Sequence, residues 1–171
     1  MEPLFTNTCE LTRESYQDAL YSLFKRTRTV KILLSFVMCI LTFSYGTYYN
    51  EYIFIVFSLI FLLLPVYKYW FRIINYAKSL SERNMVIYHK EPVQTFRFFD
   101  EYVETIIQPS KGEATLYYYD IIRVEASKKL YTILFKGKSI AFLDKNKFEN
   151  INLIEFEHFI REKAVNAKVI L

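Results

Sequence analysis

The residues whose types could support metal binding are few in this chain of 171 residues. His158 follows Glu155 by three positions and precedes Glu162 by four, so a helix would place the three side chains along one stripe that can in principle hold a metal. Carboxylates at such spacings are also routine on solvated helix faces. We favour the solvated face, because no HExxH motif, second ligand pair or EF-hand loop accompanies the stripe. We expect neither a metal nor a cofactor.

Nucleophilic catalysis has even less support. Cys9 and Cys39 belong to no CxxC or metal-ligand spacing. The three glycines, Gly46, Gly112 and Gly137, lie far apart, so the sequence contains neither a GxSxG elbow nor a glycine-rich phosphate loop. We predict that the protein is not an enzyme, and an enzyme acting on lipid or phosphate is the weakest alternative.

Lysines form the remaining candidate site. Lys128, Lys129, Lys136 and Lys138 lie at the ends of two predicted hairpins. They are candidates for contact with an anionic membrane surface, where each contributes about 1 kcal/mol when close to the headgroups. The alternative is that they solubilise the domain and protect sheet edges. A formal net charge of +4 is too small for a nucleic-acid footprint, so we expect no nucleic-acid partner.

Two long apolar segments dominate the organisation of the chain. Residues 32–50 contain no charged side chain, and a helix of this length spans roughly 28 Å, enough to cross a bilayer. A second apolar segment begins at Tyr52 and extends to Phe71 if Lys68 reaches the headgroups. The sequence therefore predicts two transmembrane helices joined by a short outer turn.

Basic residues predict the orientation of these helices. The turn between them carries only Glu51, whereas Lys and Arg flank both outer ends of the pair. Cytoplasmic flanks carry an excess of such residues, so we expect a two-span protein of the cell membrane with both termini in the cytoplasm. The flanking residues are Lys25, Arg26, Arg28, Lys31, Lys68 and Arg72.

We expect the remaining segments to lie in the cytoplasm. Within residues 1–29 we expect a strand over 4–10 and an amphipathic helix over 13–27, and we expect residues 72–83 to form a helical linker. Residues 84–171 predict a domain of short strands followed by a helix that Asn152 and Glu155 open with a capping box. The seven expected strands are 85–89, 93–99, 102–108, 114–117, 121–126, 130–135 and 139–143.

This order of elements is typical of one known fold. We expect a membrane α-helical hairpin (residues 30–71) plus an α+β, mainly β cytoplasmic domain. Seven antiparallel strands closed by a C-terminal helix predict a pleckstrin-homology-like barrel or sandwich.

The chain as a whole resembles the YcxB-like membrane proteins. The resemblance rests on the N-terminal ELTRESYQDAL segment, the two adjoining spans and the segment YYYDIIRVEASKKLYTILFKGKSIAFLDKNKF. Tyr118 or Tyr119 stands where the family has a tryptophan, and LDKNKF over 143–148 replaces a proline-led stretch. The resemblance implies the architecture described above far more than it implies an activity.

These predictions lead to two hypotheses about function. In the first, the protein presents its pleckstrin-homology-like domain at the inner leaflet as an adaptor or scaffold for another membrane or cytoplasmic protein. In the second, it is an immunity protein that protects its own cell from a bacteriocin or another membrane-active toxin. Both hypotheses include the lipid bilayer as a partner, and both leave homo-oligomers open.

Overall fold

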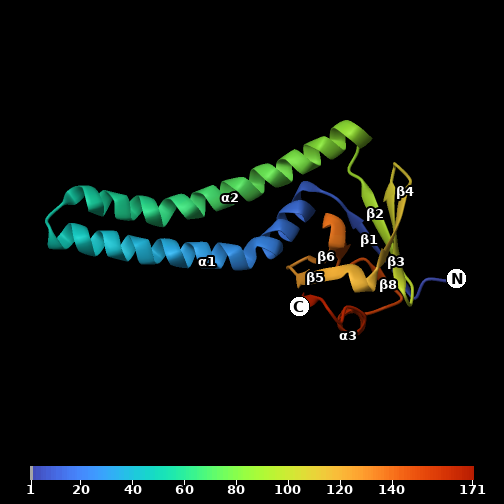
Figure 1. Cartoon of the computed structure of the whole chain (residues 1–171). Coiled ribbons are helices and arrows are strands. Elements are labelled where there is room, and N and C mark those ends of the chain that lie inside the picture. Colours follow the sequence, from blue (N-terminus) through green and yellow to red (C-terminus); the bar gives the residue numbers. More distant parts are fainter. Residues whose placement is uncertain (1) are drawn as a thin grey trace. The chain divides into compact units, whose positions relative to one another are not determined.

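The computed structural model describes residues 2–171, apart from the side chains of residues 26–28 and of Lys138. The chain divides into two compact units: one combines the residues up to Leu23 with Ala77–Leu171, and the other is Phe24–Tyr76. The elements, most of them labelled in Figure 1, are β1 (Phe5–Glu10), α1 (Arg13–Tyr48), α2 (Tyr52–Tyr88), β2 (Val93–Phe98), β3 (Tyr102–Gln108), β4 (Gly112–Tyr117), η1 (Tyr118–Asp120), β5 (Ile121–Ala126), β6 (Leu130–Phe135), η2 (Lys136–Lys138), β7 (Ile140–Asp144), β8 (Phe148–Glu149), α3 (Leu153–Lys163) and β9 (Lys168–Ile170).

Over the described residues, the strands form two sheets. The strand order is β4-β3-β2-β1-β8 in one sheet and β7-β6-β5-β9 in the other. Paired strands are antiparallel, except that β9 runs parallel to β5. Strand β1 precedes both long helices in the sequence, yet it lies between β2 and β8. One sheet domain is therefore built from segments on both sides of the helical hairpin.

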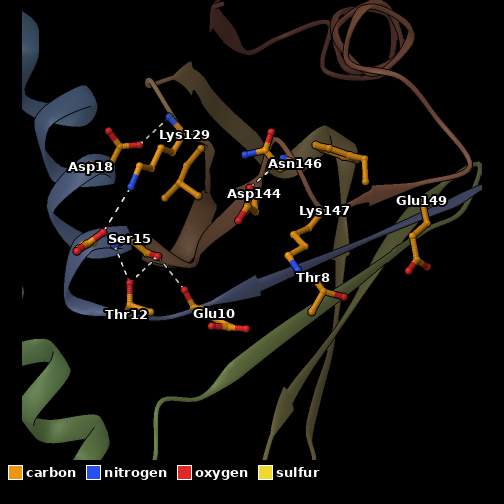
Figure 2. A pocket seen from close by; sticks show the side chains of 13 residues that line it. Thr8, Glu10, Thr12, Ser15, Asp18, Lys129, Asp144, Asn146, Lys147 and Glu149 are labelled. Atoms are coloured by element: carbon orange, nitrogen blue, oxygen red, sulfur yellow. Dashed lines mark hydrogen bonds and ion pairs between the residues drawn. The ribbon is translucent and has the colours of Figure 1, made fainter.

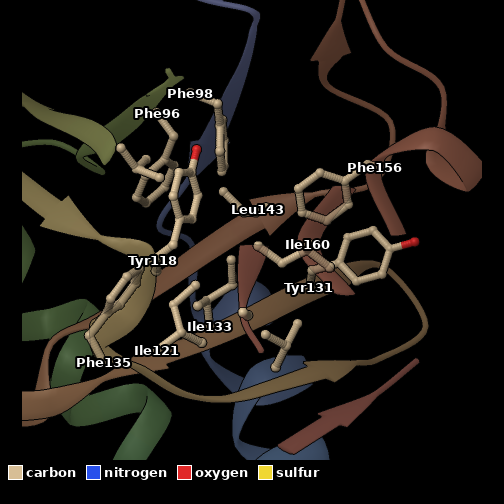
Figure 3. Close-up of a cluster of buried hydrophobic side chains, with 14 of the residues drawn as sticks. Phe96, Phe98, Tyr118, Ile121, Tyr131, Ile133, Phe135, Leu143, Phe156 and Ile160 are labelled. Atoms are coloured by element: carbon tan, nitrogen blue, oxygen red, sulfur yellow. The ribbon is translucent and has the colours of Figure 1, made fainter. Parts of the chain in front are cut away.

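Aromatic and aliphatic side chains from both sheets and from α3 form the core of this domain, as Figure 3 shows. On β2 the buried Phe96 and Phe98 alternate with the exposed Arg97, which is the period of a strand with one face in the core. Phe156 of α3 is fully buried, and its ring lies edge-on to that of Phe98 at 5.9 Å. Helix α3 thus fills the space that the curled sheets leave open.

The predicted capping box at the start of α3 is confirmed. The Asn152 side chain accepts a hydrogen bond from the Glu155 backbone N–H at 2.9 Å, and the Glu155 carboxylate accepts one from the Asn152 backbone N–H at 3.3 Å. These bonds satisfy N–H groups that have no partner inside the helix.

A buried amide joins the two sheets. The Asn7 side chain on β1 donates to the Asp144 carbonyl at 2.8 Å and accepts from the Asp144 backbone N–H at 3.1 Å. Asn7 is fully buried, so both bonds are made away from water. The side chain acts here as an additional backbone pair at the corner where β1 meets β7.

The first turns of α1 cover the opposite face of the second sheet. Tyr16 packs edge-on against Phe142 of β7 with ring centroids 5.7 Å apart. Phe142 is in register with Thr132, which is in register with Glu125. The buried Glu125 carboxylate contacts the Arg123 guanidinium, so the charge beneath the helix has a partner.

Helices α1 and α2 lie side by side in the other unit (Figure 1). The Ser35 hydroxyl of α1 donates to the Phe61 carbonyl of α2. A Cβ atom at Gly46 would lie 3.1 Å from the Glu51 carbonyl oxygen and from side-chain atoms of Ile55, so glycine permits this close approach. The contact between the helices therefore includes small residues, and beside Gly46 the Tyr45 ring packs edge-on against Phe54 of α2 at 4.8 Å.

The structure shows, among residues 2–171, two helical stretches that are long and apolar enough to cross a membrane. They are Thr29–Tyr48 and Tyr52–Tyr88. Their large apolar side chains are mostly exposed. The structure thus contains two long apolar helices, two sheets and a C-terminal helix, and the pleckstrin-homology-like fold stays a prediction.

The prediction of a strand over residues 85–89 is wrong. Helix α2 continues to Tyr88, and His89, at a φ of 56°, ends it. Valine, isoleucine and tyrosine favour strands, but extending an existing helix carries no new nucleation cost. Asn84 also donates to the Tyr16 hydroxyl at 2.7 Å, which ties this part of α2 to the start of α1. The other six strands predicted after the spans are confirmed as β2–β7, and the early strand is confirmed as β1.

Candidate functional site

An exposed aromatic surface lies where β4 passes into β5. We call this surface, formed by Tyr117, Tyr119, Ile122 and Lys136, the tyrosine tip. Tyr117 and Tyr119 are 42% and 62% exposed, and their rings stack with centroids 5.2 Å apart. Ile122, the next exposed apolar side chain, is 46% exposed. Exposed aromatic residues held in a defined geometry are typical of protein-binding surfaces.

The middle tyrosine of the YYY run holds the tip in place. Tyr118 points into the core, where its hydroxyl donates to the Phe99 carbonyl at 2.7 Å and its ring packs edge-on to Phe159. Burial, and secondarily the Asp100 carboxylate, raise the pKa of the Tyr118 hydroxyl well above its ordinary value, so it stays protonated and donating. Because Tyr118 points inward within a short 3₁₀ turn, its two neighbours point outward.

Lys136 connects turn η2 to the tyrosine tip. Its ammonium group donates to the Tyr119 carbonyl at 3.2 Å and pairs with the Asp120 carboxylate at 3.3 Å. It also lies 5.9 Å from the centroid of the Tyr119 ring. Turns η1 and η2 are thereby held together, so the tip combines two aromatic rings with a cationic edge.

The structure separates the four candidate lysines into two groups. Lys128 and Lys129 lie in the turn before β6, whereas Lys136 and Lys138 lie in η2 after it. A strand rises about 3.3 Å per residue, so the two groups are roughly 20 Å apart. Lys129 pairs with Glu14 at 3.4 Å and Lys128 is exposed, while the side chain of Lys138 lies outside the described residues. Their predicted contact with a membrane surface stays a prediction.

The predicted basic flanks all lie on the long helices. Lys25, Lys31, Lys68 and Arg72 are exposed. The side chains of Arg26 and Arg28 lie outside the described residues.

A polar groove of about 610 Å³ lies beside β1, the first turns of α1 and the end of β7 (Figure 2). Acidic side chains outnumber basic ones in its lining. The acids are Glu10, Glu14, Asp18, Asp144 and Glu149, and the bases are Lys129 and Lys147.

Several of the groove's polar groups bind one another. The Asp18 carboxylate accepts hydrogen bonds from the Ser127 hydroxyl and from the Lys129 backbone N–H, the latter at 3.1 Å. Thr12 caps α1 by accepting from the Ser15 backbone N–H at 3.1 Å. The lining contains no histidine or cysteine, so it offers no imidazole base or thiol nucleophile. The hydrogen bonds of Asp18 therefore link the first turns of α1 to the β5–β6 hairpin.

The Glu155, His158 and Glu162 stripe lies on the exposed face of α3. Glu155 turns its carboxylate toward the Asn152 backbone as part of the capping box, away from the role of a metal ligand. Across residues 2–171, no group of three His, Cys, Asp or Glu side chains is arranged to hold a metal ion.

The cysteines occupy different surroundings. Cys9 is buried on β1, and burial, followed by the Asp144 and Glu10 carboxylates, raises the pKa of its thiol to about 12. Cys39 is half-buried on α1, and both cysteines are free. The raised pKa keeps the Cys9 thiol protonated and unreactive.

The sequence alone did not predict the tyrosine tip. A usable signal is the YYY run itself, because three consecutive side chains cannot all point into one core. The sequence left open which tyrosine is buried, and the structure identifies Tyr118.

Comparison with known proteins finds no matching family model, no similar curated protein and no similar solved structure. Membership of the YcxB-like family stays a prediction.

Proposed function

We propose that this protein is a membrane-anchored, non-enzymatic interaction protein. Its two apolar helices cross the cell membrane, and its sheet domain, of pleckstrin-homology-like and YcxB-like type, binds a partner protein in the cytoplasm. The observation that carries the proposal is the tyrosine tip, a rigid exposed aromatic surface on a domain whose own core is already filled.

The anchor is supported by the exposure of the helical unit. Leucine, isoleucine and phenylalanine side chains cover α1 and α2 and remain open to their surroundings. Exposed apolar surface on this scale is unfavourable in water and favourable in hydrocarbon. Pro65 of α2 has no N–H to offer the Phe61 carbonyl, and the Ser35 hydroxyl of α1 donates to that carbonyl instead, so this backbone group has a partner without water.

The placement of both termini on one side is supported by the origin of the sheet domain. β1 and the first turns of α1 precede the helical hairpin, and β2–β9 follow it. Both segments belong to one folded unit, so a hairpin inserted between them starts and ends on the same side of a membrane. The basic flanks favour the cytoplasm as that side.

The protein-binding role is supported by the chemistry of the tip. Tyrosine supplies a large contact area at a small entropic cost, and the hydrogen bond from Lys136 and the burial of Tyr118 order this surface in advance. The groove at β1 offers no comparable surface, because several of its charged groups bind within the domain.

The test is photo-crosslinking in native membranes. A photoreactive phenylalanine analogue at position 119 is expected to capture a protein, and the same analogue at Ile154, exposed on α3, is not. Replacing Tyr117 by alanine in the first protein should reduce the capture by at least about fivefold, since a central aromatic contact contributes 1–4 kcal/mol to binding.

Three outcomes would contradict the proposal. Capture of lipid alone at position 119 would make the tip a membrane-surface contact, together with Lys136 and Lys138. Equal capture at positions 119 and 154 would show that the tip has no special role. Capture of a protein only from position 63, within the hairpin, would favour the immunity hypothesis.

A further inference from the structure

The helical unit contains a groove of its own, separate from the sheet domain. It has a volume of about 500 Å³ and lies between the middle turns of α1 and α2. Its lining is mainly apolar and includes Ile32, Leu33 and Phe36 of α1 and Leu62, Val66 and Trp70 of α2. Next to the groove, the hydrogen bond from the Ser35 hydroxyl to the Phe61 carbonyl holds the two helices together.

We propose that this groove binds one anionic phospholipid of the inner leaflet. The proposal rests on the membrane placement proposed above. An acyl chain lies in the groove, and the headgroup phosphate lies at its cytoplasmic end beside Lys25 and Arg72.

The length of the groove fits a lipid chain better than a protein helix. Its lining extends over residues 29–36 and 62–70, which at 1.5 Å per residue is about 12 Å. One leaflet contributes about 15 Å of hydrocarbon, so the groove matches a single acyl chain. A transmembrane helix needs about 20 residues and would make most of its contacts outside the groove.

The charges fit an anionic headgroup. Lys25 lies four residues before Thr29 and so falls on the groove side of α1, one turn closer to the cytoplasm. Arg72 lies three residues after Tyr69 and falls on the same side of α2. Both side chains are exposed. Lys31 and Lys68 belong to the same two stretches of helix but do not line the groove and do not lie beyond its cytoplasmic end, so they provide matched controls.

Trp70 makes the proposal directly measurable. It is the only tryptophan in the chain, and it lines the groove. Bromine atoms on an acyl chain quench tryptophan fluorescence on contact. The full-length protein is reconstituted into phosphatidylcholine vesicles that contain either brominated phosphatidylglycerol or brominated phosphatidylcholine at the same mole fraction.

We expect half-maximal quenching at a mole fraction of brominated phosphatidylglycerol about fivefold lower than that of brominated phosphatidylcholine. The double variant Lys25→Gln, Arg72→Gln should bring this ratio close to one. The double variant Lys31→Gln, Lys68→Gln removes the same amount of charge and should leave the ratio unchanged.

The other outcomes overturn the site. Equal quenching by both lipids would show that Trp70 contacts only bulk lipid. If both double variants lost the preference for phosphatidylglycerol equally, the preference would come from a general attraction between basic residues and anionic lipid, without a specific site. Quenching that falls as the protein-to-lipid ratio rises would show that a second copy of the chain fills the groove. Absence of quenching by either lipid would contradict the membrane placement itself, and so the proposed function.

Discussion

The sheet domain and the helical hairpin use the same apolar residue types in opposite ways. Phe156 of the sheet domain is fully buried, whereas Leu63 of the hairpin is 65% exposed. The domain gains stability by removing apolar surface from water, and its helices and strands therefore bury one face each in the core. In the hairpin, small residues such as Gly46 and Ser58 are buried and most of the large apolar side chains are exposed. The surrounding solvent thus decides which face of an element carries its large side chains.

The largest expected effect tests burial in the sheet domain. Phe156→Ala should lower the free energy of unfolding by about 3–5 kcal/mol, because it leaves a cavity between the two sheets. The measurement is urea unfolding of the protein in detergent micelles, followed by near-ultraviolet circular dichroism. Leu63→Ala in the hairpin should change this free energy by less than about 0.5 kcal/mol, and equal losses in the two variants would show that the two regions do not differ in how they use apolar side chains.

The buried charge on the second sheet should come next. Arg123→Ala leaves the Glu125 carboxylate buried without its partner and should cost about 3 kcal/mol in the same urea experiment. Replacing both residues by leucine removes the charge along with its partner and should recover most of that loss. A double variant as unstable as Arg123→Ala would show that the ion pair is not the cause.

A smaller effect tests the contact inside the hairpin. Gly46→Leu should destabilise the helix pair by about 1–3 kcal/mol, because a side chain at this position meets Glu51 and Ile55. The midpoint of thermal unfolding in detergent, followed by Trp70 fluorescence, should fall by several degrees. Ser44→Leu adds the same side chain at an exposed position of α1 and should leave the midpoint unchanged.

The smallest effect concerns the pH dependence contributed by Cys9. Its pKa of about 12 in the folded domain lies above the ordinary value of 9.0. The thiol's contribution to stability is therefore complete below pH 9 and is lost as the pH rises from 9 toward 12. In a Cys39→Ser background, Cys9 at pH 8 should react with iodoacetamide only after urea unfolds the domain. Rapid labelling of the folded protein would contradict the burial of β1.

Local patterns in the sequence sufficed for most elements. The alternation along β2 and β3, the capping box of Asn152 and Glu155, and the two uncharged segments each depend on residues close together in the chain. Residues 85–89 have the composition of a strand but continue α2, because strand propensity is weak beside the extension of a preceding helix. The short strands β8 and β9 leave little signal, since each depends on a distant pairing partner.

The sequence by itself determined two apolar helices, a run of strands and a closing helix, because these follow from periodicity and length. Only the tertiary structure decided that β1 lies inside a sheet formed after the hairpin, and that Asn7 ties this sheet to Asp144. It also decided that Tyr118 points inward while Tyr117 and Tyr119 point outward. The physical reason is that these features depend on which distant segments pack together, and packing is a property of the folded chain as a whole.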